Sequence, residues 1–339
     1  MSAVLFTLLA CIDKVDLALP SSELPLIVEG FVTDDPGPYV VKISKAFPAD
    51  GRYHPRLGVA GARVVITDDA GFRDVLSEFP GGSYVTDSLR GVIGRSYRLT
   101  ITTANNLKLE STWEKMMPAG TIDRIYFEFV KGQTKDDNLP IEGFNVYADA
   151  TTAPGSERRI RWSWKGTYII ITDPAALTIG NPPTPLACAE NCICCTCWVS
   201  EREVSPILAN QGFLGSNKLN RNFMTFLIAN NIRFFEKYRI EIEQMEVSQP
   251  VFDFLQGVRG QVDNASSLFQ PPFFELKGNI KSAASPAAVI GIFSANAVTR
   301  KSIYIYQSDI PYVIYADRPI GDCRAVAPNS VNVQPPFWE

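Results

Sequence analysis

The sequence has almost no histidine and none of the short motifs that mark common enzyme families. Its one histidine is His54, in the loop-like stretch 52–56, and a Ser-His-Asp or Cys-His arrangement would have to recruit that imidazole. There is no G-x-S-x-G elbow, Walker A loop, dinucleotide fingerprint or H-E-x-x-H. The sequence therefore indicates no catalytic residue, metal or cofactor, and His54 is interpreted as a surface residue.

The sequence also lacks an excess of positive charge and a long apolar run. Charged residues make up 20% of the 339 residues, and the net charge is −4, which argues against a nucleic-acid partner because such proteins carry a basic stripe. After Cys11 no apolar stretch approaches the roughly 18 residues of a membrane-spanning helix. The hydrophobic fraction of 46% is typical of a folded globular protein, and the length favours two domains.

Paired charges are present, but in settings typical of turns and strand faces. The dipeptides Asp68-Asp69 and Asp136-Asp137 are interpreted as solvated turns, with weak calcium ligation as the alternative. The run Arg158-Arg159-Ile160-Arg161 could bind a carboxylate or phosphate through its guanidinium groups. Alternation over residues 159–168 favours instead a strand with one apolar side and one cationic, solvent-facing side.

The most informative positive feature is the N-terminal run that ends in Leu8-Leu9-Ala10-Cys11. The apolar residues 3–10 are too few to span a bilayer and match a secretory signal with a small residue at its cleavage site. We therefore expect residues 1–10 to be a lipoprotein signal peptide, Cys11 to be lipidated, and residues 11–25 to be a tether. Two or more acyl chains would give a stable membrane anchor. The alternative is an ordinary apolar N-terminus with a chance cysteine.

Residues 26–115 show the alternation of short strands that is typical of a β-sandwich. Residues 26–28, 39–43, 63–67 and 97–102 are strand candidates separated by turn clusters rich in Pro, Gly and Asp. About seven such strands predict an immunoglobulin-like sandwich. The series G-x-V, D-x-x-G, G-x-Y and G-x-x-Y-x-L-x-I, at 30–32, 68–71, 82–84 and 94–101, resembles the carboxypeptidase regulatory-like sandwich modules of bacterial surface proteins.

Residues 120–339 predict a larger β-rich domain with at least one helix. Strand candidates lie at 125–129, 145–149 and 238–242. A helix is expected after Ser248, the candidate N-cap, because Pro250 falls in its first turn and apolar residues recur at helical spacing. Those residues are Val251, Phe254, Leu255, Val258 and Val262.

Cysteine is concentrated in the segment CAENCICCTC. In an exported protein, six cysteines beyond the lipidated one are expected to form disulfides. A bridge from the cluster to the distant sixth cysteine would stabilise the fold by roughly 4 to 5 kcal/mol in the chain-entropy model, although any of the five could be its partner. The competing interpretation is a metal–thiolate site, which export disfavours. The six residues are Cys188, Cys192, Cys194, Cys195, Cys197 and Cys323.

The C-terminal half contains an ordered series of short motifs. The series is Cys197-Trp198-Val199, then Gly278-Asn279-Ile280 at the end of the stretch 269–280, G-x-F-S-A at 291–295, Asp322-Cys323-Arg324 and a terminal Phe337-Trp338. It resembles a Bacteroidota lipoprotein family labelled as a domain of unknown function. The resemblance covers nearly the whole chain. Gly278 and Gly291 are expected at positions of close backbone approach or positive φ.

The resemblance implies an outer-membrane lipoprotein, because genes of this family commonly lie beside TonB-dependent receptors. We expect a lipid-anchored protein facing the cell exterior that acts as a non-enzymatic accessory or binding subunit. Its expected partner is an outer-membrane β-barrel, most simply a TonB-dependent receptor for nutrient uptake. The alternatives are a structural subunit of an outer-membrane assembly or export complex and, with less support, an exported hydrolase.

Overall fold

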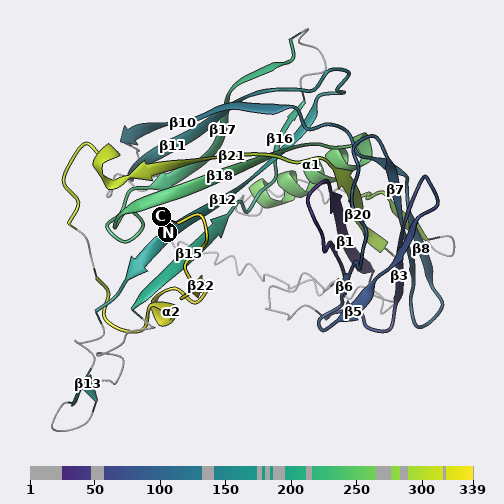
Figure 1. Ribbon diagram of the computed structural model, residues 1–339, viewed down its shortest axis with the longest axis horizontal. Helices are drawn as coiled ribbons and strands as arrows, with labels where there is room; N and C mark the ends of the chain where they lie inside the picture. Colours follow the sequence, from purple (N-terminus) through teal and green to yellow (C-terminus); the bar gives the residue numbers. More distant parts are fainter. Residues whose placement is uncertain are drawn as a thin grey trace, which may run out of the picture.

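The computed structural model describes residues 25–46, 57–131, 141–173, 178–179, 184–185, 195–210, 216–264, 276–282, 289–315 and 318–338. These residues form mainly β-structure, with two sheet assemblies side by side and one long helix between them (Figure 1). The predicted fold class, mainly β with at least one helix, is confirmed. No helix in these ranges has the length and apolar character needed to cross a membrane.

The first assembly is a sandwich of two sheets around one apolar core. Alternation builds this core: in β7 every second residue is buried, and Leu99 packs with Val41 and Tyr84 of the facing sheet. One sheet has the order β20 (Val289–Asn296), β1 (Leu26–Thr33), β2 (Val40–Lys45), β6 (Ser83–Val85), β5 (Ser77–Phe79). The other has the order β19 (Ile280–Ser282), β8 (Lys108–Ser111), β7 (Ser96–Thr102), β3 (Arg63–Asp68), β4 (Arg73–Val75), with β9 (Glu114–Lys115) paired to β7.

Two strands of this sandwich come from the C-terminal half of the chain. β20 runs parallel to β1, with Leu26 opposite Val289, and β19 pairs with β8. The core accordingly includes Ile280 and Phe293. The predicted division into domains at 26–115 and 120–339 is therefore wrong for residues 280–296, because strands far apart in sequence can pair without leaving a local signal.

The second assembly packs a three-stranded sheet on a six-stranded sheet. Their shared core is aromatic, with Phe144 from the smaller sheet against Trp162 and Tyr238 from the larger. The smaller sheet has the order β10 (Thr121–Lys131), β11 (Glu142–Thr151), β17 (Lys218–Ile228). The larger has the order β21 (Thr299–Tyr306), β18 (Lys237–Glu246), β12 (Arg159–Ile171), β15 (Thr196–Arg202), β22 (Ser330–Val331), with β16 (Ile207–Asn210) also paired to β12. β13 (Thr178–Ile179) and β14 (Thr184–Pro185) form a separate pair, and η3 (Gln307–Asp309) follows β21.

Helix α1 (Gln249–Asn264) packs against residues of both sandwiches. It begins directly after Ser248, as predicted, and buries Val251, Phe252 and Leu255. These residues contact Ile292 of β20 and residues of the second sandwich in one apolar cluster. The helix therefore packs between the two sandwiches and joins them through this apolar cluster.

Polar side chains also join the sandwiches. The buried Gln244 accepts a hydrogen bond from the Trp162 indole N–H at 3.0 Å and donates one to the Ala119 carbonyl at 2.6 Å. Arg300, just after the crossing from β20 to β21, forms ion pairs with Asp35 and Glu243. Because these contacts are satisfied only when both sandwiches are in place, they fix the relative position of the two bodies.

The G-N-I and G-x-F-S-A motifs form one interlocked backbone contact in the first sandwich. A Cβ atom on Gly278 would lie 1.6 Å from the Gly291 carbonyl oxygen, and one on Gly291 would lie 2.0 Å from that of Val28. The Asn279 side chain accepts from the Phe293 N–H at 2.9 Å and donates to its carbonyl at 2.6 Å. The expectation of close backbone approach at both glycines is confirmed, and the motifs are structural.

The C-terminal segment is attached to the second sandwich by a disulfide and an aromatic anchor. Cys323 begins the short helix α2 (Cys323–Val326) and is bonded to Cys197 of β15. Asp322 caps this helix by accepting from the Arg324 N–H at 2.8 Å. Trp338 is buried and packs in a cluster with Ile169 and Trp198.

Candidate binding surface

The outer face of the three-stranded sheet carries a group of aromatic and arginine side chains. Strand alternation sends Phe127 of β10 and Phe144 and Val146 of β11 into the core, so Tyr126 of β10 and Tyr147 of β11 face outward. Phe223 is 50% exposed, and the side chains of Arg124 and Arg221 are 67% and 57% exposed. We call this set the aromatic–arginine face; it comprises Arg124 and Tyr126 of β10, Tyr147 of β11, and Arg221 and Phe223 of β17.

The rings of this face lie side by side across the three strands. Tyr126, Tyr147 and Phe223 are successive cross-strand neighbours. The two tyrosine rings stack with centroids 5.6 Å apart, and Phe223 meets Tyr147 edge to face at 5.9 Å. The guanidinium of Arg124 lies 4.6 Å from the Tyr126 centroid, and that of Arg221 lies 4.4 Å from the Tyr147 centroid. The side chains therefore support one another in fixed positions.

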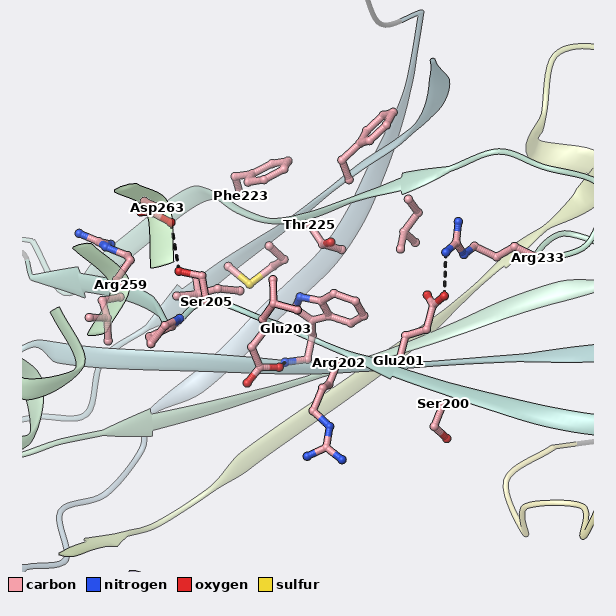
Figure 2. Close-up of a pocket in the computed structure, with 18 of the residues that line it drawn as sticks. Ser200, Glu201, Arg202, Glu203, Ser205, Phe223, Thr225, Arg233, Arg259 and Asp263 are labelled. Atoms are coloured by element: carbon pink, nitrogen blue, oxygen red, sulfur yellow. Dashed lines mark hydrogen bonds and ion pairs between the residues drawn. The ribbon is translucent and has the colours of Figure 1, made fainter. Parts of the chain in front are cut away.

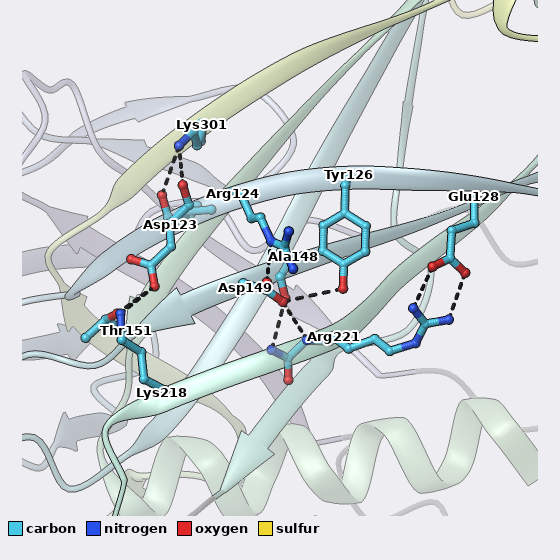
Figure 3. A network of polar contacts seen from close by, with 12 residues as sticks. Asp123, Arg124, Tyr126, Glu128, Ala148, Asp149, Thr151, Lys218, Arg221 and Lys301 are labelled. Carbon is cyan, nitrogen blue, oxygen red and sulfur yellow. Dashed lines mark hydrogen bonds and ion pairs between the residues drawn. The ribbon is translucent and has the colours of Figure 1, made fainter.

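Carboxylates hold both arginines in place (Figure 3). Arg221 donates two parallel hydrogen bonds to Glu128, at 2.6 and 2.7 Å, and these bonds lower the pKa of that carboxyl. Asp149 accepts from the Arg124 guanidinium at 2.5 Å and from the Arg221 backbone N–H at 2.6 Å. Burial acts to raise the pKa of Asp149, but these donors lower it overall.

The backbone at Arg221 is itself unusual and contributes to this arrangement. Its φ is +53°, in the left-handed region that non-glycine residues seldom adopt. The residue lies where the register between β11 and β17 shifts, between Ala148 and Ala150. This irregularity turns the Arg221 N–H toward Asp149, so backbone and side chain of one residue bind two different carboxylates.

A groove of about 1290 Å³ borders the aromatic–arginine face at Phe223 (Figure 2). One wall is β17, and the opposite wall is Trp164 of β12 with the connection between β15 and β16. Arg259 and Asp263 of α1 line one end of the groove. Asp263 is held by Ser205 at 3.3 Å.

A partly buried polar cluster closes the other end of the groove. Glu201 pairs with Arg233 at 2.7 Å and accepts a hydrogen bond from the Tyr238 hydroxyl at 2.9 Å. Burial raises the pKa of Tyr238, and the neighbouring Glu201 raises it further. Nearer the centre, Glu203 accepts from the Trp164 backbone N–H at 3.0 Å, and burial raises its pKa.

The cysteines of the predicted site are only partly within the described residues. Cys11, Cys188, Cys192 and Cys194 lie outside them. Cys197 is bonded to Cys323, which selects one of the five partners that the sequence left open, and Cys195 is also disulfide-bonded. Among the described residues no group of three or more His, Cys, Asp or Glu side chains could hold a metal ion.

The other charged motifs have structural contacts where they are described. Asp68 and Asp69 form a turn in which both bind Arg95, at 2.8 and 2.5 Å. In the arginine run, Arg159 pairs with Glu157, and Arg161 lies over the Phe31 ring of the first sandwich at 5.6 Å. The prediction that the cationic side of this strand faces solvent is therefore wrong at Arg161, because Phe31 of the first sandwich lies against it, while Lys165 on the same side is exposed. His54 and the Asp136-Asp137 pair lie outside the described residues.

The fold and this surface define a two-sandwich β-protein with an exposed aromatic–arginine face. Residues 12–302 match the model of a family described as a domain of unknown function, DUF4249. The match covers most of the chain, so the protein belongs to this family. No curated protein matches the sequence significantly.

Proposed function

We propose that this protein is a lipid-anchored lipoprotein of the outer membrane, facing the cell exterior, and a non-enzymatic accessory or binding subunit of an outer-membrane β-barrel. A TonB-dependent receptor is the proposed barrel, as the family resemblance implies. The anchor rests on the motif Leu8-Leu9-Ala10-Cys11. The second support is the aromatic–arginine face, which gives the protein a surface suited to a protein partner.

The observation that carries the proposal is the rigidity of that face. Tyrosine and arginine are enriched among residues that dominate protein–protein binding energy. Here the rings and guanidiniums are already fixed by stacking and by Glu128 and Asp149, so binding would order few additional side chains. Both carboxylates have lowered pKa values and are engaged by arginine, which favours recognition over proton transfer near neutral pH.

The test is recovery of the complex from native membranes. We would solubilise the outer membrane in mild detergent and purify the protein through a C-terminal tag. The expected result is a barrel protein at comparable stoichiometry, with a contact that buries more than about 1,000 Å². Recovery of the protein alone at native expression would contradict the receptor proposal.

A matched pair of variants tests whether the aromatic–arginine face makes the contact. Arg221→Ala removes a guanidinium that stacks on Tyr147 and pairs with Glu128. Arg98 has the same kind of environment on the first sandwich, over Trp113 at 4.7 Å and paired with Glu110 at 3.0 Å. We expect Arg221→Ala to weaken barrel binding by about tenfold or more and Arg98→Ala to leave it unchanged. Equal effects of the two variants would rule out this face.

A further inference from the structure

The groove lies between two sheet edges that have no strand partner in the described part of the chain. β17 pairs only with β11 and ends the three-stranded sheet, and β16 pairs only with β12. Residues of both strands line the groove, including Leu208 of β16 and Thr225 of β17, which is labelled in Figure 2. An edge strand presents a row of backbone N–H and C=O groups that can pair with another strand.

Along the groove, these two edges lack the features by which sheet edges are normally protected; the charged residues of β17, Lys218 and Arg221, lie in its first half, before the groove. Residues 223–228, Phe-Met-Thr-Phe-Leu-Ile, and residues 207–210, Ile-Leu-Ala-Asn, contain no charged residue and no proline. Proteins usually discourage strand addition with lysine, other charges or proline at an edge. The opposite edges of the same two sheets have such charges, with Lys131 on β10 and Arg300 and Lys301 on β21. The contrast singles out the groove side.

The size and charge of the groove fit an extended chain. Its volume of about 1290 Å³ exceeds the 300–1,000 Å³ of typical small-ligand pockets. Arg233 is neutralised by Glu201, and Asp263 is held by Ser205. Arg259, at the α1 end, forms no ion pair within the described residues, and neither does Arg202 of the β15–β16 wall. The guanidinium of Arg259 can therefore pair with an acidic group of a bound chain at that end.

We propose that the groove binds an extended segment of the partner protein, which adds as a strand to the free edge of β17. The segment would be largely apolar, with an acidic residue placed to pair with Arg259. This inference rests on the proposed function in that it names how the partner is bound. Main-chain hydrogen bonds to β17 would give affinity, and Phe223 and Trp164 would contact alternate side chains of the added strand.

The test uses the full chain with Cys11→Ser and a phage-displayed library of peptides of about ten residues, the upper length of a typical strand. We expect enriched peptides that alternate apolar residues and contain an acidic residue. Single N-methyl groups on synthetic copies should weaken binding by about tenfold or more at alternate positions only, because every second N–H of an added strand points to the edge. No enrichment, as expected if another part of the chain or a second copy fills the groove, or insensitivity to N-methylation, would overturn the inference.

Two protein variants with similar exposure locate the peptide. Phe223 on β17 and Phe79 on β5 are both edge-strand residues, 50% and 52% exposed. We expect Phe223→Lys to weaken peptide binding by about tenfold and Phe79→Lys to have no effect, with hydrogen-exchange protection of residues 223–228 when peptide binds to the unsubstituted chain. Hydrogen-exchange protection of other residues and not of 223–228 would contradict binding of the peptide in the groove. Because the peptide assay needs no barrel, its outcome is separate from the co-purification that tests the proposed function.

Discussion

At the scale of single residues, the family motifs are explained by backbone proximity. Gly278 and Gly291 let three backbone segments approach more closely than any side chain would allow, and Asn279 fixes them by binding both backbone groups of Phe293. The glycines could be selected from the sequence as special positions. The residues that they contact could not be predicted from the sequence, because Val28 belongs to a distant strand.

Replacing Gly278 is therefore expected to be far more damaging than replacing another glycine. In Gly278→Ala the new methyl group would collide with the Gly291 carbonyl, and we expect several kcal/mol of destabilisation or no folded protein. Gly260→Ala is the control: it lies within α1 with no atom within 4 Å of its Cβ position, and alanine should stabilise the helix by about 0.5–1 kcal/mol. Urea denaturation measures both, and equal stabilities would contradict the interlock.

Glu114 predicts a pH dependence of stability. Burial raises its pKa above the ordinary value of 4.5, against the opposing hydrogen bonds from Thr112 and Asn279. The folded protein thus holds this proton more tightly than the unfolded chain, so its contribution is greatest below the ordinary pKa and is lost as pH rises through the folded-state pKa.

We therefore expect Glu114→Gln to gain stability relative to the natural protein between about pH 4 and pH 8. Glutamine keeps the acceptor for Asn279 and carries no charge to desolvate. Glu110→Gln on the neighbouring strand, whose side chain is 53% exposed, serves as the control. Urea denaturation at the two pH values measures the free energy of unfolding of each protein. A difference between variant and natural protein that does not change with pH would contradict the role assigned to Glu114.

At the scale of elements, local sequence signals predicted the strands and the helix. They did not predict which distant strands pair. The strands predicted at 39–43 and 63–67 correspond to β2 and β3, and the helix begins where Ser248 and Pro250 indicate. Alternation and capping are local properties, so one sequence reveals them. The parallel pairing of β20 with β1 depends on residues far apart. The aromatic–arginine face was missed because alternation marks Tyr126 and Tyr147 without saying that their strands are adjacent.

The disulfide predicts how firmly the C-terminal segment is held. Cys197 and Cys323 are separated by 126 residues, so loss of the bond should destabilise the fold by roughly 4 to 5 kcal/mol in the chain-entropy model. We expect Cys323→Ala to lower the melting temperature more than the surface change Ser77→Ala on β5, which is exposed. The comparison is made by calorimetry under oxidising conditions. Similar melting temperatures for the two variants would argue against a structural role for this bond.

At the scale of the whole molecule, the two sandwiches are joined by shared chain segments and direct contacts. β19 and β20 leave the second half of the chain to complete the first sandwich, while α1, Gln244 and Arg300 bind the two together. The function of the whole molecule was the property least predictable from the sequence. Exposure and proximity of side chains, which define the binding surface and the groove, exist only in the folded molecule.

The completeness of the first sandwich can be tested with fragments. Residues 26–119 alone lack the strands that cover β1 and β8, and we expect this fragment to be unfolded by circular dichroism. The same fragment with residues 276–298 attached through a flexible linker should regain a cooperative thermal transition. A folded 26–119 fragment would show that the predicted boundary near residue 115 is a true domain boundary after all.

The pairing of β1 with β20 also imposes an order on folding. As the chain emerges from its N-terminus, β1 becomes available early, but its parallel neighbour follows only after β10 to β18 and α1. Most strands of the second sandwich can therefore pair before the first sandwich can close. Until then the β1 edge stays open, and long-range parallel pairing is slow and exposed to aggregation. During this interval the chain exposes the most unpaired strand edge, so it is then that a chaperone would have the most to bind.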